Sequence, residues 1–142
     1  MKQQDFAALA AQDYNRIPVS REVLADLETP LSAYRKLAGG PYSYFFESVQ
    51  GGEKWGRYSI IGLSCTTVLK VYGYRIEVWV DGALSETAEV ADPLAFTESF
   101  QQRYRTAPRS DLPVFHGGLV GYFGYDTVRY VEPKLRAGMP PC

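Results

Sequence analysis

Apolar and polar residues alternate most regularly in residues 66–82, TTVLKVYGYRIEVWVDG. Apolar side chains stand two positions apart in residues 76–80, which is the period of a half-buried β-strand. The break at residues 72–74, Tyr-Gly-Tyr, divides the stretch, so the pattern predicts a β-hairpin. The turn signal Asp81-Gly82 follows, and after it the pattern predicts a further short strand.

Three other apolar stretches also predict strands. Residues 42–48 and 56–63 flank a polar loop that is broken by Gly51-Gly52. Residues 114–133, VFHGGLVGYFGYDTVRYVEP, are apolar and rich in glycine, and they predict a strand that runs into a short helix around Asp126.

Three segments have helical spacing. Residues 4–12 predict a short helix from the spacing of their apolar side chains. Residues 29–39 and 92–105 each begin with an N-capping side chain, Thr29 or Asp92, followed by proline at the first helical position. The apolar stripes of these two helices are formed by Leu31, Tyr34 and Leu37 in the first and by Leu94, Phe96 and Phe100 in the second.

The order of elements predicts an α+β fold with a mostly antiparallel sheet and a few short helices packed on it. Strands outnumber helices, and the helices do not alternate with the strands one by one, as they do in a doubly wound parallel sheet. Pro18 makes the residues around it extended, as in an edge strand. A chain of 142 residues without internal repeats suits a single domain, residues 1–142.

Composition excludes several classes of function. The net charge is −1 and the basic residues are scattered, so no surface for nucleic acid or for an anionic membrane is expected. No apolar run is long enough to span a membrane, and the N-terminal residues lack the apolar core of a signal peptide. We therefore expect a cytoplasmic protein. Cys65 and Cys142 lack metal-ligand spacing, and nothing else indicates the export that a structural disulfide would suggest.

Glu47 and Ser48 form the most distinctive polar pair, because they end an otherwise apolar strand. A carboxylate can pair with an ammonium group, and a neighbouring hydroxyl can donate and accept hydrogen bonds. The pair therefore fits the polar end of an amino acid, although a solvated strand end is the simpler interpretation. His116 is the only histidine, without a partner for metal binding or catalysis, and is expected to be structural or exposed.

Glycine recurs at every third position at Gly118, Gly121 and Gly124. This spacing does not match a phosphate-binding loop. Glycine in a strand is typical of close backbone approach, so another element is expected to lie there, either within this domain or outside the chain. Tyr122 and Tyr125, together with Trp55, are expected to form an exposed apolar face.

Two motifs in combination resemble a known family. Residues 47–62, ESVQGGEKWGRYSIIG, and residues 113–133, PVFHGGLVGYFGYDTVRYVEP, resemble the N-terminal domain of anthranilate synthase component I. The segments 14–20, 29–37 and 92–100 occur in the order expected for that family. The resemblance covers almost the whole chain and is specific for chorismate-utilising synthases of the anthranilate and aminodeoxychorismate type.

The resemblance implies a function for the whole enzyme. Anthranilate synthases convert chorismate and ammonia to anthranilate and pyruvate, and a separate glutamine amidotransferase subunit, component II, supplies the ammonia. Catalysis and Mg²⁺ binding are expected in a C-terminal catalytic domain that this chain does not contain. No cofactor is expected in this chain, and the chain alone is expected to be non-catalytic.

The resemblance also implies a feedback site for L-tryptophan, with a contribution from the catalytic domain. The family motif Leu-Leu-Glu-Ser falls on residues 45–48, where Phe45 and Phe46 depart from the leucines. The tryptophan-binding residues implied in this way are Phe46, Glu47, Ser48, Arg57, Tyr58 and Ser59. Two alternatives stay open: the equivalent domain of aminodeoxychorismate synthase component I, from folate synthesis, and a free-standing binding or interaction module.

Overall fold

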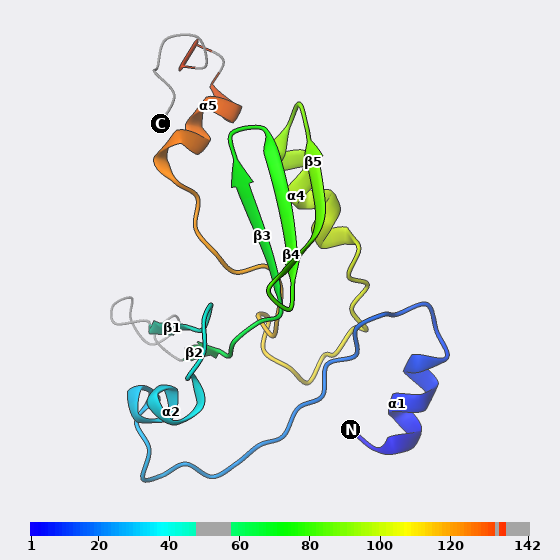
Figure 1. The fold of residues 1–142 in the computed structure, drawn as a ribbon. Helices are drawn as coiled ribbons and strands as arrows, with labels where there is room; N and C mark the ends of the chain where they lie inside the picture. The colour runs from blue at the N-terminus through cyan, green and yellow to red at the C-terminus, as the bar shows by residue number, and fades with distance from the viewer. Residues whose placement is uncertain (48–57, 133, 136–142) are drawn as a thin grey trace. The chain divides into compact units, whose positions relative to one another are not determined.

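The structure, a computed structural model, describes residues 1–47, 58–132 and 134–135. These residues form two compact units. Unit 1 consists of residues 1–21 and 71–76 and of the described residues from 88 onward, and unit 2 contains the described residues of 22–70 and residues 77–87. Figure 1 shows the elements in chain order. The helices are α1 (Gln3–Ala10), α2 (Pro30–Leu37), α4 (Pro93–Gln102), the 3₁₀ helix η1 (Tyr125–Thr127) and α5 (Val128–Val131).

Two sheets confirm the predicted α+β class. Strands β1 (Tyr44–Glu47) and β2 (Ser59–Gly62) form an antiparallel pair. Strands β3 (Thr67–Tyr72), β4 (Arg75–Val80) and β5 (Ala83–Glu89) form a three-stranded sheet in that order. The predicted hairpin is therefore present, and the segment after it forms the further strand that the turn signal predicted.

The two hairpin turns have the backbone geometry that their residues favour. Asp81 and Gly82 have φ angles of 51° and 80°, the pattern of a type I′ turn, for which Asp-Gly is a preferred sequence. Gly73 has a φ angle of 61° at the first position of the other turn, where type II′ geometry requires glycine. Both turns match the right-handed twist of the strands they join.

The predicted N-caps are confirmed. Thr29 Oγ1 accepts a hydrogen bond from the backbone N–H of Ser32 at 3.1 Å, and Ser32 Oγ accepts one from the backbone N–H of Thr29 at 2.9 Å. Asp92 Oδ1 accepts hydrogen bonds from the backbone N–H groups of Leu94 and Ala95 at 2.9 and 3.0 Å. These side chains satisfy backbone donors that have no partner within the helix, which fixes where α2 and α4 begin.

The core of unit 1 is small. Ile76, Phe100 and Ala107 are almost completely buried, as is Pro93 at the start of α4. The ring of Phe100 packs edge-on against Tyr104, with centroids 5.7 Å apart. Of the three apolar residues predicted to pack from α4, Phe100 is buried, while Leu94 and Phe96 are half-buried. The stripe predicted for α2 is mostly exposed, since Leu31 and Leu37 are both more than half accessible.

The edge strand predicted around Pro18 is replaced by a hydrogen-bonded extended segment. A single parallel bridge joins Arg16 to Thr106. Asn15 donates through Nδ2 to the carbonyl of Arg103 at 2.6 Å and accepts from the backbone N–H of Arg105 at 2.8 Å. The side-chain amide of Asn15 thus makes hydrogen bonds to the backbone of residues 103 and 105, where a paired β-strand would use its own backbone groups.

The strand predicted between residues 114 and 124 is wrong for the described chain. These residues form no strand, whereas the short helix predicted around Asp126 is present as η1 and α5. A strand needs a hydrogen-bonded neighbour, and the described residues place none beside this segment. In the part of the chain that the structure describes, no helix is long and apolar enough to cross a membrane.

Candidate functional site

The register of β1 and β2 decides which side chains share a face. Glu47 stands opposite Ser59, and Phe45 stands opposite Ile61. Side chains alternate between the faces of a strand, and directly opposite residues point to the same face. Face A therefore consists of Phe45, Glu47, Ser59 and Ile61, and face B consists of Tyr44, Phe46, Ile60 and Gly62.

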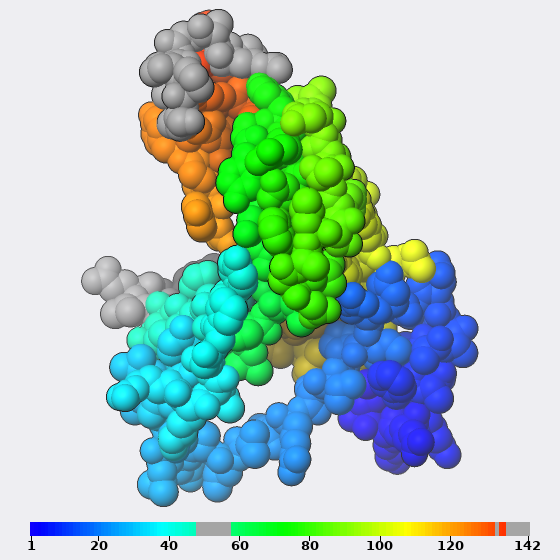
Figure 2. Space-filling view, in the orientation of Figure 1, coloured from blue at the N-terminus to red at the C-terminus, as the bar shows by residue number. Residues whose placement is uncertain are grey.

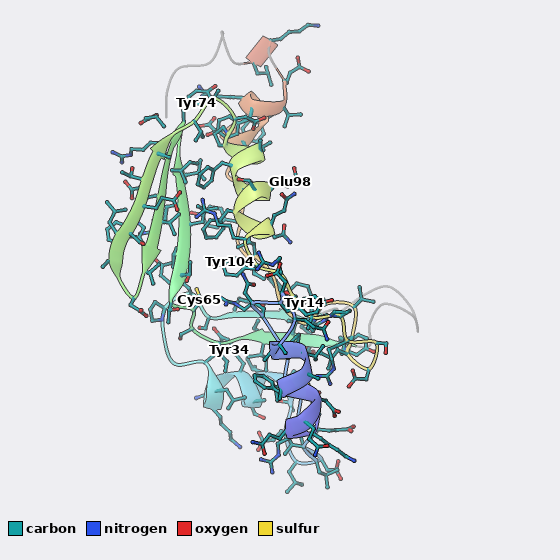
Figure 3. All side chains as sticks on the ribbon, turned by 90° about the vertical axis from the view of Figure 1, so that its right-hand side faces the viewer. Tyr14, Tyr34, Cys65, Tyr74, Glu98 and Tyr104 are labelled. Carbon is teal, nitrogen blue, oxygen red and sulfur yellow. The ribbon has the colours of Figure 1, made fainter. Side chains whose placement is uncertain are left out.

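Helix α2 packs on one end of face A. The ring of Tyr34 stacks on Phe45 with centroids 5.6 Å apart and an angle of 24° between the planes, and Figure 3 labels Tyr34 on α2. The Tyr34 hydroxyl lies 3.3 Å from Ser43 Oγ, which donates to the carbonyl of Gly40 at 3.0 Å. These contacts hold α2 against the start of β1 and leave Glu47 and Ser59 exposed at the other end of the same face.

Face B carries an aromatic pair over a glycine. Tyr44 and Phe46 have ring centroids 4.9 Å apart. A Cβ atom at Gly62 would lie 1.9 Å from Cε1 of Tyr44, so the ring rests directly on the glycine backbone. Any larger residue at position 62 would displace Tyr44. The ring of Phe46 is 50% exposed, so this face ends in an accessible aromatic surface.

The structure brings together only some of the residues that the family motif implies. Glu47 and Ser59 lie directly opposite each other on face A, while Phe46 lies on face B. Tyr58 immediately precedes β2 and is exposed. Ser48 and Arg57 lie outside the described residues. The tryptophan site therefore stays a prediction, with Glu47 and Ser59 as its described polar pair.

A charged cluster at α2 has a structural role. Glu28 accepts a hydrogen bond from Ser32 Oγ at 2.6 Å and forms an ion pair with Lys36. The hydrogen bond from Lys36, followed by the one from Ser32, lowers the pKa of Glu28 below its usual value. All three side chains belong to α2 or to the turn before it, so the cluster stabilises the helix.

A hollow in unit 2 was not predicted from the sequence. It has a volume of about 390 Å³. The Lys70 ammonium lies 4.7 Å from the centroid of the Trp79 ring, whose Nε1 donates to Glu77 at 3.0 Å. Trp79 belongs to the alternating pattern of β4. This pattern indicates that the Trp79 ring lies on one face of the strand, but it does not indicate a hollow on that face.

The described residues contain no candidate metal centre. Residues 1–47, 58–132 and 134–135 contain no group of three His, Cys, Asp or Glu side chains that could hold a metal ion. His116 is exposed, and its Nδ1 lies 2.9 Å from the carbonyl oxygen of Pro113. This agrees with the structural or surface role expected for His116.

The sequence of this α+β chain is similar to curated proteins that share one name. It is 60% identical to anthranilate synthase component 1 of Pseudomonas aeruginosa over 135 residues, which are 95% of this chain and 27% of that protein. It is 57% identical to the Pseudomonas putida protein of the same name, over 99% of this chain and 29% of that protein. The protein of that name from Neisseria meningitidis serogroup B is 52% identical, over 93% of this chain and 27% of that protein.

These similarities confirm the resemblance that the sequence motifs carried: the chain is similar to a part of anthranilate synthase component 1. The chain spans less than a third of the length of these relatives. No protein-family model matches it, and no solved structure matches it.

Proposed function

We propose that the chain is the N-terminal regulatory domain of an anthranilate synthase component I. The observation that carries this proposal is 60% identity over 95% of the chain to a protein of that name. The complete enzyme would form anthranilate and pyruvate from chorismate and ammonia in the cytoplasm, as the first step of tryptophan biosynthesis. A C-terminal catalytic domain would bind chorismate and Mg²⁺, and a component II subunit would supply ammonia from glutamine.

The proposed role of this chain is to bind L-tryptophan at the end of β1 and β2. The Glu47 carboxylate would accept hydrogen bonds from the ammonium group of the ligand, and Ser59 faces the same side of the strand pair. An amino-acid ammonium has three donors, so an exposed carboxylate with a neighbouring hydroxyl satisfies its chemistry. Phe46 and Tyr58 are accessible aromatic side chains close in sequence to this pair, and aromatic rings are suited to contact an indole ring. Phe46 lies on face B, so a ligand held by Glu47 would reach it only around the end of the strand pair.

The relatives favour this function over the alternatives. The three proteins described above are named for anthranilate rather than for aminodeoxychorismate. The extent of the match also argues against a free-standing module, because a module of independent function would not be expected to follow these enzymes over 93–99% of its length.

The test is tryptophan inhibition of the full-length enzyme. Substitution of Ser48→Phe adds bulk and removes a hydroxyl at the position that the family motif assigns to the ligand ammonium group. Loss of a hydrogen bond to a charged group costs about 1.5–3 kcal/mol, or about 10–150-fold in affinity. The inhibition constant for tryptophan should therefore rise by at least about ten-fold. An unchanged inhibition constant would contradict the proposed site.

A further inference from the structure

We propose that residues 118–124 form an interior strand of a β-sheet whose other strands come from the part of the protein beyond this chain. The inference rests on the proposed function, because it requires a longer polypeptide. It assigns to this glycine-rich segment an assembly role that is separate from the tryptophan site.

The side-chain pattern is that of a strand buried on both faces. With a period of two, Leu119, Gly121 and Phe123 lie on one face, and Val120, Tyr122 and Gly124 lie on the other. Both faces are apolar, and no residue from 118 to 124 is charged. An edge strand or a half-exposed strand would carry polar residues on one side. The pattern therefore indicates the middle of a sheet that is covered on both sides.

The described chain does not provide such a sheet. Tyr122 is 94% exposed and Phe123 is 72% exposed. Among the described residues, no backbone hydrogen bond joins residues 118–123 to a strand. Figure 2 shows the orange atoms of this region on the surface of the molecule. The segment therefore has apolar side chains and backbone groups that could pair within a sheet, and the described residues do not use them in this way.

The segment is held at its N-terminal side by Arg109, whose side chain is only 10% exposed. Its guanidinium donates to both carboxylate oxygens of Asp111, at 2.7 and 2.6 Å, and to the carbonyl of Pro18 at 2.7 Å. These bonds connect the chain just before the segment to the N-terminal residues of unit 1.

The other end of the segment is held by Tyr130 of α5. The Tyr130 hydroxyl donates to the carbonyl of Gly73 at 2.5 Å, and its ring packs edge-on against Tyr74 at 5.7 Å. The apolar residues between the two anchors therefore belong to a connection fixed at both ends. Such a connection loses less conformational entropy on pairing than a free tail would.

The glycines leave room for close approach. A Cβ atom at Gly121 or Gly124 would meet nothing within 4 Å. Gly117 and Gly118 have φ angles of 150° and 145°, which favour glycine and set the direction of the chain where the segment begins. The close packing predicted from the glycine spacing is thus not made at Gly121 or Gly124 by the described residues, and the spacing suits an element outside the chain.

The length of the relatives supports this choice of occupant. The matched region is only 27–29% of the Pseudomonas proteins, so most of their length remains to supply neighbouring strands. A second copy of the chain fits less well. Two identical segments can pair with each other along one edge, but each would keep its second edge unpaired, and an interior strand requires both.

The experiment uses the 142-residue chain and a separate polypeptide, the Pseudomonas aeruginosa relative without its matched 135 residues. Hydrogen exchange is measured for the chain alone and for the mixture. We expect exchange of the backbone amides in residues 118–124 to slow by at least about ten-fold in the mixture only. Anthranilate formation from chorismate and ammonium is followed in the same samples.

A matched pair of proline variants tests whether strand pairing is involved. Val120→Pro removes one backbone donor from the proposed strand, and it should weaken assembly by about ten-fold or more. Val23→Pro, at an exposed valine outside any helix or strand, should assemble as the parent does. Equal behaviour of the two variants would overturn the inference.

The possible failures can be distinguished. Anthranilate formation by the mixture without protection of residues 118–124 would support the proposed function and overturn the strand. Protection in the chain alone, at concentrations where it self-associates, would identify a second copy as the partner and overturn the inference. Absence of both assembly and activity would contradict the proposed function and the strand together.

Discussion

Glu47 and Ser59 lie directly opposite each other across the antiparallel pair of β1 and β2, and both are exposed. Helix α2 covers the other end of the same face through Tyr34 and Phe45. The ribbon thus has a packed end and a polar end. The polar end carries Glu47 and Ser59, two of the six residues that the family resemblance implies for tryptophan binding.

Replacement of Glu47 tests the charge at this end. In the full-length enzyme, Glu47→Gln should raise the inhibition constant for tryptophan by about 10–150-fold, because a neutral amide cannot pair with an ammonium group. Glu98→Gln is the matched control, since Glu98 is exposed on α4 (Figure 3). Inhibition curves measure the effect. The same shift in both variants would show that the charge at Glu47 has no special role.

The close contact between Tyr44 and Gly62 predicts a stability effect. Gly62→Ala places a methyl group 1.9 Å from the Tyr44 ring, so the ring or the strand must move. Overpacking of this kind costs about 1–3 kcal/mol. Urea unfolding should show a lower midpoint for this variant. Gly39→Ala is the control, because a Cβ atom there would meet nothing within 4 Å.

A double substitution identifies the cause of that effect. If the ring is responsible, Tyr44→Ala should remove most of the additional cost of Gly62→Ala, so the two changes should be strongly non-additive. Additive free energies of unfolding would instead assign the cost to the backbone of β2.

The N-cap of α4 provides a third prediction. Asp92→Ala removes the acceptor for two backbone N–H groups and should destabilise the chain by about 0.5–2 kcal/mol. Asp92→Ser keeps a capping oxygen and should retain most of the stability. The free energy of unfolding in urea measures the difference. A serine variant as unstable as the alanine variant would show that capping is not the cause.

The sequence predicted well the features that depend on adjacent residues. The caps at Thr29 and Asp92 and the turn at Asp81-Gly82 involve residues within a few positions of each other, so local chemistry determines them. The edge strand predicted around Pro18 is instead an extended segment with one bridge, from Arg16 to Thr106. The side chain of Asn15 in this segment bonds to Arg103 and Arg105, far along the chain, and the sequence around Pro18 contains no sign of these bonds.

The candidate site shows the same limit. Residues 44–46 are all aromatic, so the pattern could not tell which of them share a face with Glu47. The long connection between β1 and β2 does not fix the register as a two-residue turn would. Only the register places Ser59 opposite Glu47 and Phe46 on the other face. The strand expected in residues 114–124 failed for a related reason, because its sequence suits a sheet that the described chain does not provide.

A fourth prediction concerns catalysis. The chain alone should not convert chorismate, because the acid–base and Mg²⁺-binding groups are proposed to lie in a C-terminal catalytic domain outside these 142 residues. Pure protein with chorismate, Mg²⁺ and ammonium should give no anthranilate fluorescence above a buffer blank. The full-length enzyme at the same concentration is the positive control. Turnover by the chain would place catalytic groups within these 142 residues.

The last prediction concerns acid and the Arg109–Asp111 pair. Hydrogen bonds from the Arg109 guanidinium lower the pKa of Asp111 from 3.8 to about 2. A carboxyl group with a lowered pKa in the folded state stabilises the fold above its unfolded pKa. This contribution is lost as the pH falls from about 4 to about 2, because the carboxyl group then becomes protonated in both states.

Asp111→Asn should therefore be less stable than the parent at pH 6, and the difference should shrink between pH 4 and pH 2. Urea unfolding at several pH values measures both proteins. Asp26→Asn, which removes one exposed carboxylate outside the pair, controls for the change in net charge. A constant difference between the parent and Asp111→Asn down to pH 2 would contradict the prediction. In that case Asp111 would act through packing, and Arg109 would hold residues 109–111 to Pro18 without help from the charge of its partner.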